Sequence, residues 1–193
     1  MTWTADQCYR EGLDFFTDRV QAMDADDWNR PSPCAGWRAV DVLGHIGAAT
    51  QFGTQLLQGA NPGWSPPSGA PGDAVEGDPT AWWDGLVGPA RDALEGIDVS
   101  KVVDSPVGKR SIGEGLSFPA IDLFVHGWDL ARAAGGDVEI PAEAIEFAHR
   151  VFDNVPPEMM RSPKVFATAI DIGPEASASD AFLAWTGRDP RGQ

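Results

Sequence analysis

The sequence predicts an all-α fold, a bundle of four long helices with a short C-terminal extension. Apolar residues recur at helical spacing in four long segments, and stretches rich in glycine and proline separate these segments. No stretch has the pattern of a multi-stranded sheet. The chain has 193 residues, 42% of them hydrophobic, which suits one domain with a real core. We expect the bundle to occupy residues 1–164 and the extension, residues 165–193, to pack on it.

Capping patterns set the expected helix ends. Thr4 and Gln7 form a capping box, and Asp78-Pro79 supplies an N-cap and a first-turn proline. Gly135-Gly136 is a typical C-terminal cap. The long helices are therefore expected at residues 5–23, 39–57, 79–94 and from 112–117 to 135. Shorter helices are expected at residues 141–154 and after Ser177, whereas residues 97–110 look extended or irregular.

Charge and composition exclude several classes of function. The net charge is −15, so the chain should repel nucleic acid and anionic membranes. No apolar run approaches the roughly 20 residues of a membrane span, and the N-terminus lacks the features of a signal peptide. Two cysteines, Cys8 and Cys34, do not make a disulfide framework. We expect a cytoplasmic protein with reduced thiols.

The stretch Ile121–Ala133 carries the main functional signal. As a helix it is apolar almost all round, which is typical of a buried helix, yet Asp122, His126 and Asp129 share one narrow face. If this polar face is buried, its groups need partners, and a metal ion is one way to supply them. The alternative is a helix at the bundle surface with its polar face in water.

A metal site can be assembled from two helices. Asp122 and His126 stand at positions i and i+4, so adjacent helical turns present two ligands to one ion. His45, on the inward side of the second helix, would add a third ligand and leave positions open for water or substrate. Imidazole and carboxylate suit zinc, with nickel, iron or manganese as alternatives. Packed core histidines would give the same pattern, and His149 is assigned to the surface.

Four motifs resemble the actinobacterial metal-binding branch of the DinB-like superfamily, whose best-known relatives are mycothiol-dependent maleylpyruvate isomerases. The motifs are Pro31-Ser-Pro-Cys-Ala-Gly-Trp37, Val40-Asp-Val-Leu-Gly-His45, Val125-His-Gly-Trp-Asp-Leu-Ala-Arg-Ala133 and Gly187-Arg-Asp-Pro190. The resemblance implies a four-helix bundle that holds a divalent metal through His45, Asp122 and His126. It also implies a homodimer.

The sequence departs from that family pattern in three places. The resemblance implies a glutamate where this chain has Asp122, and a capping serine or threonine where it has Arg38. The isomerases also carry a separate C-terminal domain, and residues 165–193 are too short to form one. The maleylpyruvate reaction itself is therefore left open.

The leading hypothesis is a thiol-dependent transferase or isomerase. The metal would lower the pKa of a bound low-molecular-weight thiol, mycothiol by resemblance, which would then attack a small electrophile. A hydrolase with a metal-activated water and a non-catalytic metal- or ligand-binding bundle remain as alternatives.

Other residues have expected supporting roles. Asp129 would orient a ligand histidine or pack through Arg132, and Cys34 is assigned to packing. The indole rings of Trp64, Trp82 and Trp83 would wall the substrate space, with a core role as the alternative for the paired residues. Trp64 stands in the loop 59–78, which is either a lid or a connector.

Overall fold

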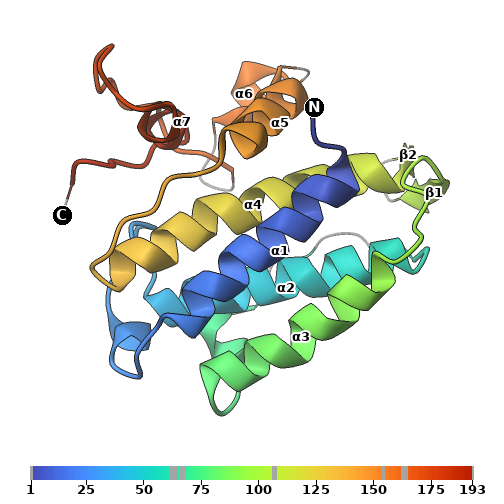
Figure 1. Ribbon diagram of the computed structural model, residues 1–193, viewed down its shortest axis with the longest axis horizontal. Coiled ribbons are helices and arrows are strands. Elements are labelled where there is room, and N and C mark those ends of the chain that lie inside the picture. The colour runs from blue at the N-terminus through green and yellow to red at the C-terminus, as the bar shows by residue number, and fades with distance from the viewer. Residues whose placement is uncertain are drawn as a thin grey trace.

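Four long helices pack side by side in the computed structural model and form the body of the molecule (Figure 1). α4 lies against both α1 and α2, and α3 lies against α2 and α1. The bounds of the four helices are α1 Ala5–Gln21, α2 Ala39–Leu57, α3 Pro79–Ala93 and α4 Ile112–Ala133. The structure describes residues 2–60, 65, 68–105, 108–153, 155–161 and 165–192. The prediction of a mostly helical chain is confirmed.

Local capping fixes where the helices begin. The Gln7 side chain accepts a hydrogen bond from the Thr4 amide at 3.0 Å, as the predicted capping box requires. A further capping box sets the start of α4, because Glu114 accepts from the Ser111 amide at 2.7 Å and Ser111 Oγ accepts from the Glu114 amide. α4 therefore begins at Ile112, the early end of the predicted window.

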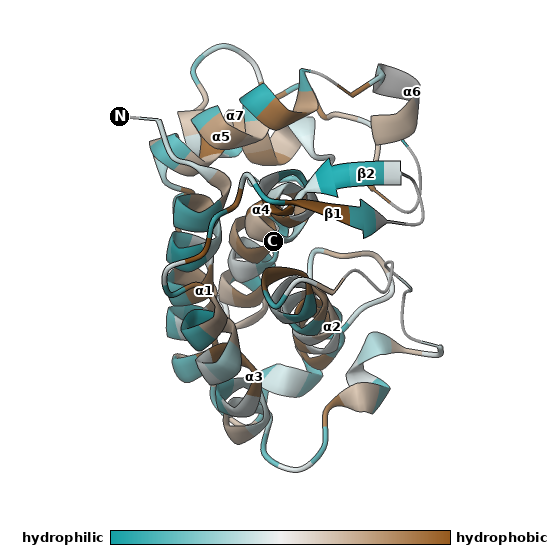
Figure 2. Cartoon of the chain, turned by 90° about the vertical axis from the view of Figure 1, so that its right-hand side faces the viewer, coloured by the Kyte–Doolittle hydropathy of each residue, from teal (hydrophilic) through white to brown (hydrophobic). Residues whose placement is uncertain are grey.

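A small hairpin joins α3 to α4 and departs from the all-α expectation. β1, Val102–Ser105, pairs antiparallel with β2, Gly108–Ser111. The sequence predicts only an extended or irregular segment here. Figure 2 shows β1 as the more hydrophobic of the two strands, and Val103 on it is buried. The hairpin therefore packs on the helical body through β1.

Glycines allow neighbouring elements to approach α2 closely. A Cβ atom at Gly44 would lie 2.0 Å from the carbonyl oxygen of Pro71, in the short 3₁₀ helix η2, Pro71–Ala74. A Cβ atom at Gly47 would lie 2.2 Å from the Trp82 ring of α3. Only a hydrogen in place of a side chain leaves room for these contacts. These two glycines in the interior of α2 thus let η2 and α3 pack directly against its backbone.

The C-terminal part forms a smaller helical layer beside α4 (Figure 1). It contains α5, Ala142–Phe152; α6, Pro157–Met160; and α7, Ala178–Trp185. α5 packs against both α4 and α7. Arg161 donates hydrogen bonds to the carbonyl oxygens of Ala167, before α7, and Trp185, at its end. Among the described residues, no helix combines the length and the apolar character that a membrane span requires.

Candidate metal centre

The structure brings His45, Asp122 and His126 together where α2 packs on α4. His45 Nε2 lies 3.8 Å from Asp122 Oδ2. The ring centroids of His45 and His126 are 4.9 Å apart. One ligand atom from each residue lies within 4.8 Å of the other two. Ligand atoms around a tetrahedral zinc ion lie roughly 3.4 Å apart at metal distances of about 2.0–2.1 Å. Small side-chain adjustments therefore suffice to hold one divalent ion.

The three groups are neither fully buried nor free in solvent. Their side chains are 20%, 30% and 10% exposed for His45, Asp122 and His126 respectively. Trp37 covers part of the site, with its ring 5.2 Å from that of His45 and 6.1 Å from that of His126. The remaining exposure gives small molecules access to the three side chains. An open coordination position is the mark of a catalytic rather than a structural metal site.

Asp129 reaches the far side of the His126 ring. Its Oδ2 atom lies 2.8 Å from His126 Nδ1. Because an ionised carboxylate only accepts hydrogen bonds, Nδ1 carries the proton and Nε2 is left with its lone pair. This is the arrangement in which an outer carboxylate orients a metal-binding histidine.

Arg188, which stands in the Gly187–Pro190 motif but had no predicted role, is the main partner of Asp129. The Asp129 side chain has no solvent exposure, and Arg188 donates to its Oδ1 at 2.9 Å and to its Oδ2 at 2.7 Å. Burial alone would raise the pKa of Asp129, but the Arg188 charge and the hydrogen bond from His126 hold it well below its usual value. Asp129 is therefore ionised. Arg132, its expected packing partner, donates instead to the Gly192 carbonyl.

Cys34 belongs to the same network, which corrects its assignment to packing alone. Its thiol donates to Asp129 Oδ2 at 3.2 Å, and Arg188 Nη2 lies 3.4 Å from the sulfur. His126 Nδ1 is 3.8 Å away. Residue spacing does not predict this contact, because Cys34 stands in an irregular segment with no histidine nearby in the chain. Its place in the Pro31–Trp37 motif, before His45, was the available signal.

The protonation states suit metal binding. Burial raises the pKa of Asp122, but the neighbouring His45 and His126 outweigh this and hold it below its usual value. Burial lowers the pKa of His126, against the opposing effect of Asp129. At neutral pH the site thus offers a carboxylate and a neutral imidazole, which are the forms that bind metals.

A second group, Cys34, His126 and Asp129, also has metal-ligand spacing. Its carboxylate already receives two hydrogen bonds from Arg188, and a guanidinium beside the group repels a cation. The donor chemistry therefore favours His45, Asp122 and His126 as the ligand set.

A family model described as the mycothiol maleylpyruvate isomerase N-terminal domain matches residues 9–131. The chain belongs to this family. The matched range contains the three candidate ligands together with Cys34 and Asp129, and it ends before Arg188.

Two solved structures resemble the chain. One is a mycothiol-dependent maleylpyruvate isomerase, with a TM-score of 0.56 and 18% identity. The other is a histidine-to-alanine variant of such an isomerase, with a TM-score of 0.57 and 17% identity. Each match covers 74% of this chain and 65% of the other, so the chain spans less than two thirds of these isomerases. The likeness shows a shared fold. No curated protein matches the chain.

The structure describes two of the three tryptophans that were predicted to wall a substrate pocket, Trp82 and Trp83. Trp83 is fully buried and donates from Nε1 to Thr17 Oγ1 at 2.9 Å, so it has the core role that was the alternative prediction for the paired tryptophans. Trp82 is half-buried against Gly47. Trp64 lies outside the described residues.

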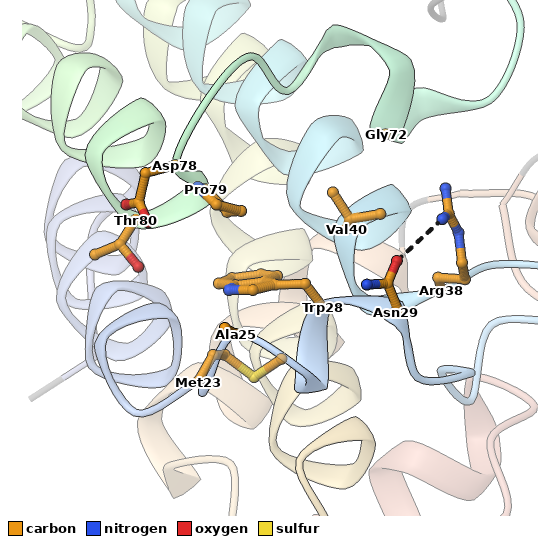
Figure 3. A pocket seen from close by; sticks show the side chains of 10 residues that line it. All are labelled: Met23, Ala25, Trp28, Asn29, Arg38, Val40, Gly72, Asp78, Pro79 and Thr80. Carbon is orange, nitrogen blue, oxygen red and sulfur yellow. Dashed lines mark hydrogen bonds between the residues drawn. The ribbon is translucent and has the colours of Figure 1, made fainter.

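A separate cavity of about 400 Å³ lies between the segment before α2 and the start of α3 (Figure 3). The Trp28 ring spans it, and Arg38 donates to Asn29 at its edge. Arg38 is the N-cap residue of α2, but its side chain makes no capping hydrogen bond. The Asp41 carboxylate instead accepts a hydrogen bond from the Arg38 amide at 2.9 Å. None of the three candidate ligands lines this cavity.

Proposed function

We propose that the chain binds a divalent metal ion, zinc in the first place, through His45, Asp122 and His126. We further propose that it acts as a mycothiol-dependent enzyme of the isomerase or transferase type. The observation that carries the proposal is the meeting of two imidazoles and a carboxylate from two helices within 4.8 Å. Family membership supports the thiol, since the family is described by mycothiol maleylpyruvate isomerase.

In this proposal, the residues around the metal ligands have separate roles in the reaction. When bound, a metal ion would lower the pKa of a coordinated thiol and so supply a thiolate at neutral pH. Asp129 binds the Nδ1 side of the His126 ring, which leaves Nε2 for the ion, and Trp37 limits the access of water from its side of the site. The exposed fractions of His45 and Asp122 leave the entrance through which a thiol and a small electrophile would arrive.

Metal analysis of the purified protein tests the site. We expect stoichiometric metal in the wild type and a large loss in His45→Ala and in His126→Ala. His149→Ala is the matched control, because this third histidine is exposed on α5, where its ring contacts Phe182 and Trp185. Unchanged metal content in both ligand variants would remove the site from consideration.

A turnover assay tests the thiol. The metal-loaded protein is incubated with an electrophilic substrate, maleylpyruvate first, in the presence and absence of mycothiol. We expect turnover that depends on both the thiol and the metal. Metal-dependent formation of hydrolysis products without the thiol would instead support a hydrolase that uses metal-bound water.

A further inference from the structure

Arg188 connects the C-terminal segment to the candidate metal centre. It follows α7 in the chain, 59 residues after Asp129, and its guanidinium makes two hydrogen bonds to the Asp129 carboxylate. Only 11% of the Arg188 side chain is exposed, and Asp129 is fully buried. Parallel pairing of a guanidinium with a carboxylate fixes both distance and orientation, which a single charge contact does not.

The end of α7 aims Arg188 at this carboxylate. Gly187 has φ of +87°, a left-handed conformation that favours glycine and terminates helices, and the Arg188 amide donates back to Leu183 O. A Cβ atom at Gly187 would lie 2.7 Å from Ala167 Cβ, so the turn also needs glycine for space. Thr186 Oγ1 lies 3.4 Å from Arg188 Nη1. The turn and its hydroxyl thus direct the guanidinium towards α4.

The orientation of the carboxylate matters for His126. Asp129 Oδ2 is shared by Arg188 Nη2 at 2.7 Å, His126 Nδ1 at 2.8 Å and the Cys34 thiol at 3.2 Å. Because the carboxylate has no contact with solvent, water cannot replace a lost donor without rearrangement. Without Arg188 the carboxylate would be an incompletely compensated buried charge, free to rotate or take up a proton.

We propose that Arg188 is a positioning residue for the metal centre, holding Asp129 so that His126 keeps its proton on Nδ1 and presents Nε2 to the ion. This inference rests on the proposed function. The family match ends at residue 131, so it assigns no role to Arg188. The proposal makes the segment after α7 part of the site, and metal affinity then depends on a residue outside the four long helices.

If Arg188 only anchored the C-terminal segment, the loss of another anchor of that segment should have the same effect on metal affinity. Arg161 also ties this segment down, through the carbonyl oxygens of Ala167 and Trp185, and no contact between Arg161 and Asp129 appears among the described residues. Arg161→Gln therefore weakens the anchoring without touching the carboxylate, and serves as the matched control for Arg188→Gln.

The experiment measures zinc affinity by chelator competition in the full-length wild type, Arg188→Gln, Arg188→Lys and Arg161→Gln. Loss of an outer partner typically lowers metal affinity by about 10–100-fold, and we expect this for Arg188→Gln. Arg188→Lys keeps the charge without the paired hydrogen bonds and should lose most of the same affinity. Arg161→Gln should retain wild-type affinity even if its melting temperature falls. If Arg188→Gln does not fold, Arg188→Lys carries the comparison.

A second readout needs no metal. Nitrogen-15 NMR of the metal-free proteins reports which ring nitrogen of His126 carries the proton. We expect the Nδ1–H form in the wild type and in Arg161→Gln, and a mixture of the two forms in Arg188→Lys. Wild-type affinity together with a pure Nδ1–H form in the Arg188 variants would overturn the proposal, as would equal losses of affinity in Arg161→Gln. A wild type that binds no zinc would refute the proposed function, and the NMR comparison would still decide the role of Arg188.

Discussion

The Sγ atom of Cys34 lies 3.2 Å from Oδ2 of Asp129, across 95 positions in the sequence. Burial is the main cause that raises the pKa of this thiol, and the Asp129 charge adds to it, while Arg188 opposes both. Cys34 thus serves as a neutral hydrogen-bond donor to a buried carboxylate. A thiolate there would face a fixed negative charge, which argues against Cys34 as the nucleophile of the proposed reaction.

Cys34 should therefore resist alkylation. At pH 7–8 we expect iodoacetamide to modify it far more slowly in the native protein than in urea, because only the thiolate reacts and the raised pKa keeps the thiol protonated. Peptide mapping by mass spectrometry follows Cys34 and Cys8 separately. Equal rates for Cys34 in the folded and unfolded protein would contradict the hydrogen-bonded, protonated state.

The site residues on helices could be predicted from the sequence, and those in irregular segments could not. The three candidate ligands, His45, Asp122 and His126, stand on regular helices, so periodicity predicts that they lie on inward faces. The packing of α2 on α4 then brings them together. Cys34, Trp37 and Arg188 come from irregular segments. The direction of such side chains depends on how loops cross the helices, which no local pattern encodes.

The substitution of Asp122 gives a direct test of the carboxylate ligand. Asp122→Asn keeps the size of the side chain but removes its charge, so we expect zinc affinity to fall by at least the roughly 10–100-fold seen for lost outer partners. Asp122→Glu restores a carboxylate, and we expect it to bind zinc more tightly than Asp122→Asn. Asp104→Asn, on the exposed part of β1, is the control. Equal affinities in the asparagine variant and the wild type would exclude Asp122 as a ligand.

We expect substitution by alanine to have opposite effects at Gly44 in α2 and Gly85 in α3. Only Gly44 is in close contact with another element, η2. Gly44→Ala should destabilise the fold by about 1–3 kcal/mol, because its methyl group would meet the Pro71 carbonyl oxygen at 2.0 Å. Gly85→Ala, in the interior of α3 with no neighbour within 4 Å of the new Cβ, should stabilise it by about 0.5–1 kcal/mol. Urea unfolding of both variants gives the comparison. A stabilised Gly44→Ala would show that η2 does not rest on α2.

We expect the buried Cys8 thiol to make the folded protein less stable at alkaline pH. It is fully buried on α1, and burial raises the pKa of its thiol from 9.0 to about 12, against a smaller opposing effect of Arg150. The unfolded chain therefore releases this proton near pH 9, while the folded chain holds it until about pH 12. The stabilisation from the neutral thiol is complete below pH 9 and is lost between these two values, by up to about 1.4 kcal/mol per pH unit for one proton.

The pH dependence of urea unfolding between about pH 8 and pH 10.5 measures this linkage. Cys8→Ala removes the titrating group, so its free energy of unfolding should fall less steeply with pH than that of the wild type, even though the variant is less stable at neutral pH. The slope is reduced rather than abolished, because burial also raises the pKa of Tyr9 and of Cys34. Identical slopes in the variant and the wild type would mean that Cys8 ionises equally easily in the folded and unfolded chains.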